Sequence, residues 1–110
     1  MNELTTQQVF GRLNDAGLND AQVVDVREAE ELVDGTISGA RHIPLAQIPG
    51  STGLLDQARP VIAVCRSGRR SAAAAEQLAA AGFTAYTMTG GMIEWTGAGL
   101  PIAVPHTTAH

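Results

Sequence analysis

The sequence predicts a single α/β domain built on a central, mainly parallel sheet with helices on both of its faces. Short apolar runs rich in β-branched residues alternate along the chain with segments of helical spacing or of strong helix formers. Strands that alternate with helices imply right-handed crossovers and hence parallel pairing. The length of 110 residues fits one domain with one core, and 45% of the residues are apolar, as in ordinary globular proteins.

The first helix is expected to begin at Thr5, whose spacing to Gln8 is that of a capping box. Apolar residues follow at helical spacing up to Leu13. Gly17 is expected to end this helix.

Four short apolar runs are expected to be strands, over residues 22–26, 40–43, 61–64 and 84–88. Between them the sequence predicts a short helix over 28–33, a helical turn over 45–48, an alanine-rich helix over 71–81, and a last helix that opens at Gly90-Gly91. Residues 49–53 are expected to form a mobile loop. The domain is expected to span residues 1–102, with a flexible tail over 103–110.

Cys65 is the single cysteine of the chain, and it stands where the run 61–64 breaks into a loop. A thiol at this point faces the amides of a helix N-terminus and lies beside Arg66, Arg69 and Arg70, and both features favour the thiolate. One cysteine makes neither an intramolecular disulfide nor a zinc site of cysteine pairs. The sequence therefore predicts a reactive, anionic sulfur.

The charge distribution also points to this loop. The net charge of −4 argues against binding to nucleic acid, which needs a basic surface. Three of the seven basic residues nevertheless fall within five positions after Cys65, which indicates a local site for an anion. No apolar run approaches the roughly 20 residues that span a bilayer, and the first residues lack the pattern of a secretory signal. We therefore expect no membrane partner and a cytoplasmic location.

Several motifs of the chain resemble those of the single-domain rhodanese-like sulfurtransferases, from about Thr5 to Ile102. The motifs are Asp25-Val26-Arg27-Glu28, Gly39-Ala40-Arg41-His42-Ile43-Pro44-Leu45, Val64-Cys65-Arg66-Ser67-Gly68-Arg69-Arg70-Ser71, and Gly90-Gly91-Met92-Ile93-Glu94-Trp95 with Ala98-Gly99-Leu100-Pro101. Each marks a different junction between a strand and a helix. The resemblance implies the same α/β fold and a cysteine that carries sulfane sulfur as a persulfide.

The resemblance implies a sulfurtransferase of the thiosulfate type, with Cys65 as its nucleophile. The thiolate would take the outer sulfur of thiosulfate, a persulfide or a polysulfide, and a thiol, cyanide or a protein would then accept it. No cofactor and no metal is expected, because a thiolate and the loop amides suffice for this chemistry.

The loop residues Arg66, Ser67, Gly68, Arg69 and Arg70 are expected to bind the substrate and to curl their amides around the sulfur. Gly68 would allow the backbone to turn. Arg66 and Arg69 are candidates for binding an anionic donor, whereas Arg70 is expected mainly to brace the loop.

Three further residues are expected to support the loop without taking part in the reaction: Asp25, Arg27 and Ser71. Asp25 and Arg27 end a strand and would fix the neighbouring loops by hydrogen bonds.

Two alternatives stay open. A cysteine phosphatase or arsenate reductase uses a cysteine and an arginine separated by five residues, but that position is Ser71 here, and Arg70 is separated from Cys65 by four. The shorter ring should be tight for a tetrahedral oxyanion and better matched to one added sulfur atom. The other alternative is a non-catalytic module that docks a partner or senses redox state through Cys65.

Other residues are expected to have structural roles only. His42 is interpreted as a structural histidine at a strand end, and Trp95 as core packing. His106 and His110 lie in the tail, where a metal site is not expected.

The acidic residues Glu28, Glu30 and Glu31 are expected to form a solvated face. Gly35-Thr36-Ile37 stands where the family often has Gly-His-Ile, and Arg41-His42 where small or amide residues are commoner. These departures bear on the substrate or partner more than on the class of reaction.

Overall fold

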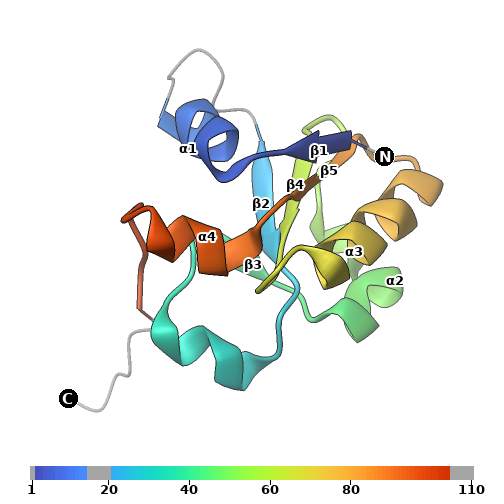
Figure 1. Cartoon of the computed structure of the whole chain (residues 1–110). Coiled ribbons are helices and arrows are strands. Elements are labelled where there is room, and N and C mark those ends of the chain that lie inside the picture. The colour runs from blue at the N-terminus through green and yellow to red at the C-terminus, as the bar shows by residue number, and fades with distance from the viewer. Residues whose placement is uncertain (1, 15–20, 105–110) are drawn as a thin grey trace.

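The computed structural model describes residues 2–14 and 21–104, which fold around one five-stranded sheet (Figure 1). The strands are β1 (Asn2–Leu4), β2 (Gln22–Asp25), β3 (Arg41–His42), β4 (Val61–Val64) and β5 (Ala85–Met88). Their order across the sheet is β1-β5-β4-β2-β3, and all four pairings are parallel. The prediction of an α/β fold on a parallel sheet is confirmed.

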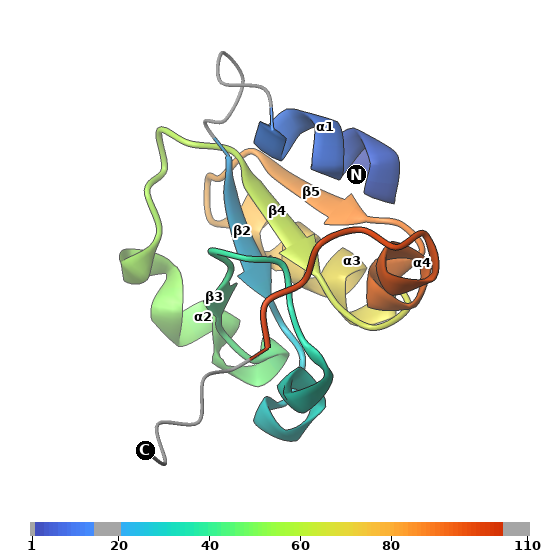
Figure 2. The same cartoon turned by 90° about the vertical axis from the view of Figure 1, so that its left-hand side faces the viewer.

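Helical segments connect the strands and cover both faces of the sheet. They are α1 (Thr6–Asn14), η1 (Ala29–Asp34), η2 (Leu45–Gln47), α2 (Ile48–Ser51), η3 (Thr52–Leu54), α3 (Arg69–Ala80) and α4 (Gly91–Gly97), where η marks a 3₁₀ helix. In Figure 1 and Figure 2, α1 and α4 lie on one side of the sheet, and α2 and α3 lie on the other. None of the helices in the described residues is long and apolar enough to cross a membrane.

The strand side chains divide between two cores because successive residues of a strand point to opposite faces. One core packs the sheet against α3 and includes Val24, Val61, Ala63, Ala74, Ala75, Leu78 and Ala85. The other packs it against α1 and α4 and includes Val9, Val23, Ile62, Val64, Met88, Met92 and Trp95. All four residues of β4 are buried, as expected for a central strand covered on both faces.

Trp95 is a core residue, as its sequence context indicates. It is 1% exposed, and its ring meets that of Phe10 edge to face at a centroid distance of 6.1 Å. Its indole N–H donates to the carbonyl of Pro101 at 2.8 Å. The residue therefore ties α4 to α1 and to the segment that follows α4.

The capping box at the first helix is confirmed. The Gln8 amide donates to the Thr5 hydroxyl at 3.1 Å, and the Thr5 amide donates to the Gln8 side chain at 2.8 Å. The predicted end of this helix at Gly17 lies outside the described residues, as do His106 and His110.

The expectation of a loop over residues 49–53 is wrong, because this segment is helical in α2 and η3. Pro49 lies in the first turn of α2, where a proline removes no needed donor and its fixed φ suits a helix. Ile48 is 1% exposed and anchors the turn in the core.

Two short pairings were absent from the predicted elements. β1 pairs with β5 at the edge of the sheet, although its three residues carry no apolar alternation. Ala103 pairs with Thr36 through two backbone hydrogen bonds of 3.0 and 2.8 Å, so a residue of the expected tail is held beside the end of η1.

Candidate active site

Cys65 lies directly after β4, at the carboxyl edge of the sheet, and its surface is fully buried. This is the edge at which parallel α/β sheets place their ligands. The residues that follow form a tight loop and then α3, which begins at Arg69, two residues earlier than predicted.

The loop turns its donors onto the sulfur. The Gly68 amide lies 3.0 Å from Sγ, the Ser71 amide 3.3 Å, and the Ser71 hydroxyl oxygen 3.4 Å. Gly68 has a φ of +106°, in the left-handed region that glycine adopts without strain. Of the loop amides expected to curl around the sulfur, those of Ser67 and Gly68 bind it. Ser71, expected only to support the loop, is itself in contact with the sulfur.

These contacts lower the pKa of Cys65 from its ordinary value. Burial of the sulfur acts in the opposite direction and is the largest single influence. The hydrogen bonds from the Ser71 hydroxyl and from the amides of Ser71, Gly68 and Ser67 together outweigh it. The protein therefore stabilises an anionic sulfur with neutral donors in a buried position.

The outer side of the same loop is held by α4. The amide of Met92 donates to the carbonyl of Cys65 at 2.8 Å, and the amide of Ile93 donates to that of Arg66 at 3.0 Å. These are first-turn amides of a helix, which have no partner within the helix. The loop carbonyls are thus bound on one side while the loop amides face the sulfur on the other.

Gly91 makes this contact possible. A Cβ atom at this position would overlap the carbonyl oxygen of Arg66 and lie 2.6 Å from that of Cys65. The φ of Gly91 is +61°, which also favours glycine. The motif at Gly90-Gly91 was predicted only to open a helix. It also allows α4 to pack closely against the loop that follows Cys65.

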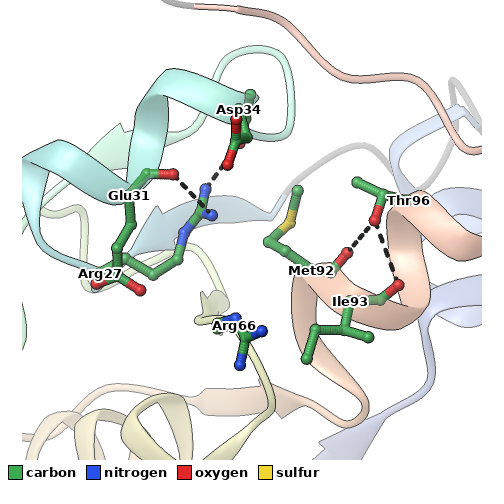
Figure 3. A pocket seen from close by; sticks show the side chains of 8 residues that line it. Arg27, Glu31, Asp34, Arg66, Met92, Ile93 and Thr96 are labelled. Atoms are coloured by element: carbon green, nitrogen blue, oxygen red, sulfur yellow. Dashed lines mark hydrogen bonds between the residues drawn. The ribbon is translucent and has the colours of Figure 1, made fainter.

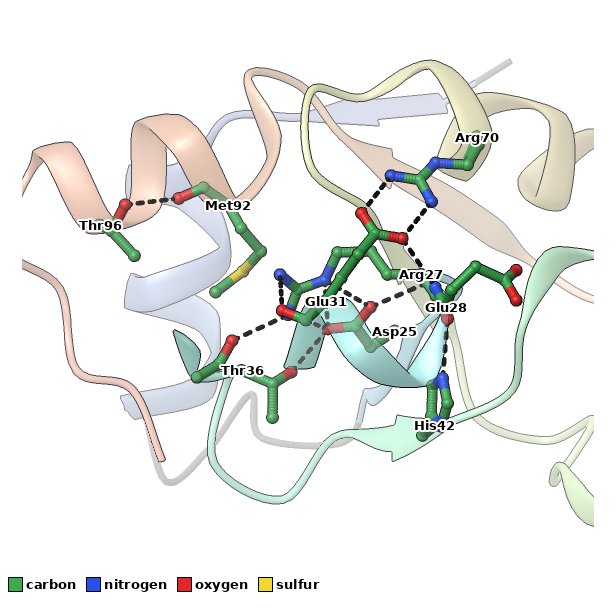
Figure 4. Close-up of polar contacts among 10 residues, drawn as sticks. Asp25, Arg27, Glu28, Glu31, Thr36, His42, Arg70, Met92 and Thr96 are labelled. Carbon is green, nitrogen blue, oxygen red and sulfur yellow. Dashed lines mark hydrogen bonds and ion pairs between the residues drawn. The ribbon is translucent and has the colours of Figure 1, made fainter. Parts of the chain in front are cut away.

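Arg70 does not point into the loop. Its guanidinium donates to both carboxylate oxygens of Glu31 in η1, at 2.6 and 2.8 Å (Figure 4). The hydrogen bond from Arg70 lowers the pKa of Glu31 to about 2, and the same pair raises the pKa of Arg70 above its ordinary value. The expectation that Glu31 belongs to a solvated acidic face is wrong, because its carboxylate is engaged by Arg70.

Asp25 and Arg27 form a buried ion pair at 2.8 Å, with side chains 1% and 6% exposed. Arg27 also donates to the carbonyls of Glu31 and Gly35, at 3.3 and 2.8 Å. The pair therefore anchors η1 to the end of β2, as expected for residues that fix neighbouring loops (Figure 4).

Two residues that depart from the family pattern complete this anchor. Thr36 donates its hydroxyl to the Asp25 carboxylate at 2.7 Å, and His42 donates from Nε2 to the carbonyl of Arg27 at 2.7 Å. The structural interpretation of His42 agrees with this contact.

Arg66 and Arg69 are exposed, and neither forms an ion pair within residues 2–14 and 21–104. Arg66 borders a cavity of about 250 Å³ between η1, the loop and α4 (Figure 3). The cavity is lined by Arg27, Glu31, Asp34, Gly35, Arg66, Met92, Ile93 and Thr96. A free guanidinium at such a rim is suited to hold a small anion.

The sequence motifs did not reveal two side chains near the loop, Glu31 and Thr87. Glu31 holds Arg70 from a separate element, and Thr87 on β5 lies 2.7 Å from the Ser71 hydroxyl. One sequence pattern indicated Thr87. The alternation of side chains along β5 places this polar residue on the face of the sheet that packs against α3.

Within the described part of the chain, no group of three or more His, Cys, Asp or Glu side chains is arranged to hold a metal ion.

Comparison with known proteins agrees with this geometry. Residues 6–98 match the family described as Rhodanese-like domain. The chain is 34% identical over 106 residues to a protein of Allochromatium vinosum named Sulfurtransferase, covering 96% of this chain and 97% of that one. It is 36% identical over 78 residues to Thiosulfate sulfurtransferase GlpE of Pseudomonas aeruginosa, covering 70% and 71%. The crystal structure of a rhodanese-related protein from Thermoplasma volcanium superposes with a TM-score of 0.87 at 26% identity, covering 96% of this chain and 100% of that one.

Proposed function

Because the chain belongs to the rhodanese-like family, and its similarity to named sulfurtransferases supports rhodanese-type sulfur transfer, we propose that it moves sulfane sulfur through a persulfide on Cys65. The proposed donor is thiosulfate, a persulfide or a polysulfide, and the proposed acceptor is a thiol, cyanide or a protein thiol. A cytoplasmic location belongs to the proposal, because a single reactive thiol suits a reducing compartment.

The observation that carries the proposal is the arrangement of donors around Sγ. The Gly68 and Ser71 amides and the Ser71 hydroxyl all lie within 3.4 Å of the sulfur. Such a cradle stabilises negative charge in the free thiolate and in the persulfide alike. The groups that contact Sγ are neutral donors.

The proposed reaction has two balanced steps. The Cys65 thiolate attacks the sulfane sulfur of thiosulfate, a sulfur–sulfur bond forms on Sγ, and the electron pair of the broken bond leaves with sulfite. An acceptor thiolate or cyanide then attacks the outer sulfur, and the electron pair returns to Sγ. The products are a new persulfide or thiocyanate, and the thiolate is restored without any net proton change.

Arg66 and Arg69 have the proposed role of attracting the anionic donor, since both are exposed and unpaired within the described chain. Arg70 has the proposed role of bracing the start of α3 through Glu31. This engagement argues against the phosphatase or arsenate reductase alternative, in which the loop arginine must bind the oxyanion itself.

The experiment that tests the proposal is intact-mass spectrometry of the reduced protein after incubation with thiosulfate and removal of small molecules. The expected result is a gain of one sulfur atom, which cyanide then removes as thiocyanate. The matched control is Cys65→Ser, which should gain nothing.

If the folded parent protein gains no sulfur from thiosulfate or from glutathione persulfide, the transfer proposal fails. The non-catalytic interaction or redox-sensing alternative would then account for the retained cysteine.

A further inference from the structure

We propose that Thr87 is a positioning residue for the sulfur site. Its hydroxyl donates a hydrogen bond to the Ser71 hydroxyl oxygen, so that the Ser71 O–H group can donate a hydrogen bond to the Cys65 sulfur. Thr87 lies on β5, 2% exposed, and Ser71 lies in the first turn of α3, fully buried. Their hydroxyl oxygens are 2.7 Å apart. The proposal deepens the proposed function, and it rests on that function only for its effect on sulfur transfer.

The direction of the bond between the two hydroxyls follows from their surroundings. Within the described residues, the Ser71 oxygen is the one hydrogen-bond partner of the Thr87 hydroxyl. A buried hydroxyl that keeps its proton without an acceptor is costly, so the Thr87 proton goes to Ser71. Ser71 therefore accepts from Thr87, and its own proton points elsewhere.

The Ser71 proton has two acceptors within reach. The carbonyl of Gly68 lies 3.1 Å from the Ser71 hydroxyl oxygen, and the Cys65 sulfur lies 3.4 Å from it. While Cys65 is a thiol, its S–H donates to the Ser71 oxygen and the Ser71 proton goes to Gly68. Every one of these buried groups then has a partner.

When the Cys65 thiol loses its proton to solvent, this hydrogen-bond pattern changes through a rotation of the Ser71 hydroxyl group. The anionic sulfur becomes the stronger acceptor, and the Ser71 hydroxyl turns from the Gly68 carbonyl to Sγ. The Gly68 carbonyl keeps a partner, because the Ala72 amide also donates to it at 3.1 Å. The rotation therefore leaves no buried group unsatisfied.

Thr87 favours the hydrogen bond from the Ser71 hydroxyl to the Cys65 sulfur in two ways. Its donated bond occupies one lone pair of Ser71 and fixes where the serine oxygen lies. It also polarises the Ser71 O–H bond, which strengthens donation to the sulfur. Of the charged residues around the loop, Arg70 is paired with Glu31 and Arg27 with Asp25, whereas Arg66 and Arg69 are exposed.

The experiment measures the thiol pKa from the pH dependence of alkylation, without any sulfur donor. Thr87→Val removes the hydroxyl at nearly constant volume, and the pKa of Cys65 should rise by about half a unit. Ser71→Ala should raise it by about one unit or more. The double variant Ser71→Ala with Thr87→Val should match Ser71→Ala alone, because Thr87 acts only through Ser71.

Two controls accompany these variants. Thr87→Ser keeps the hydroxyl and should restore the thiol pKa of the parent protein. Thr84→Val makes the same chemical change at an exposed position just before β5 and should leave that pKa unchanged. Thermal melting of each variant reports whether it is folded.

An unchanged thiol pKa in folded Thr87→Val, or shifts that add in the double variant, would overturn the proposal. Failure of persulfide formation in the parent protein would instead overturn the proposed function, because the thiol pKa is measured independently of sulfur transfer. The two failures are thus distinguishable.

Discussion

The carboxylate of Glu31 accepts two hydrogen bonds from the guanidinium of Arg70, and this pair joins η1 to the first turn of α3. The Glu31 carboxylate also accepts a hydrogen bond from the backbone amide of Glu28, at 2.8 Å. The arginine nearest to the end of the active-site loop is therefore a structural cation. We propose that Arg66 and Arg69, rather than Arg70, bind an anionic donor.

Replacing Glu31 by Gln should lower the free energy of unfolding by about 1 kcal/mol at neutral pH, because a partly exposed bidentate ion pair is lost. The difference should depend on pH. The folded-state pKa of Glu31 is about 2, below its ordinary value of 4.5, so the stabilisation is full above about 4.5 and is lost as the pH falls towards 2.

Urea unfolding of the parent and the variant at pH 7 and near pH 3 checks this expectation. Glu30→Gln is the matched control, since Glu30 is exposed, and it should leave the stability unchanged. A stability difference for Glu31→Gln that is equal at both pH values would contradict the assigned role of the ion pair.

Replacing Arg66 by Gln should raise the KM for thiosulfate roughly fivefold, with little change in the thiol pKa, because a free charge at the cavity rim is removed. The dependence of kcat/KM on ionic strength should also become shallower. Steady-state kinetics at two salt concentrations measure both effects. Arg41→Gln, an equal change of charge beside a different cavity, should reproduce neither of them.

Replacing Gly91 by Ala should reduce sulfur transfer by tenfold or more and destabilise the fold by about 1–3 kcal/mol. The new Cβ would overlap the Arg66 carbonyl and force the loop away from α4. Gly97, at the end of the same helix, has open space around it, so Gly97→Ala should be tolerated. Persulfide formation and thermal melting of the two variants give the comparison, and equal behaviour would refute the steric argument.

Replacing Asp25 by Asn should destabilise the protein by about 3 kcal/mol or more, because it leaves the Arg27 guanidinium buried without its counter-charge. Chemical denaturation measures the change. Asp34→Asn, at the exposed end of η1, is the control and should cost less than about 0.5 kcal/mol. A mild effect for Asp25→Asn would show that the carboxylate charge is not needed to hold η1.

The central part of the fold was predictable from local pattern. β4 matches its predicted bounds, because a strand buried on both faces is a continuous apolar run with a clear end at Cys65. β1 has only three residues and takes its structure from β5, so nothing within it signals a strand. Residues 49–53 contain the proline and glycines typical of loops, but Ile48 and the core determine their helical path.

The sequence predicted those parts of the candidate site whose residues follow one another along the chain. It did not predict the contacts that come from distant elements. The cysteine, the curled loop and Gly68 follow one another in sequence, so their motif specified them. Glu31 and Thr87 reach the loop from η1 and β5, and their contacts depend on tertiary packing that a linear pattern does not encode. The direct contact of Ser71 with the sulfur likewise required the geometry of the first turn of α3.

The complete burial of Cys65 also has a consequence for which molecules react with it. If Cys65 acts as the proposed nucleophile, we expect small donors with a terminal sulfur to reach it more readily than bulky disulfides, because its side chain is 0% exposed. We therefore expect the burial of Cys65 to select sulfur donors by their size.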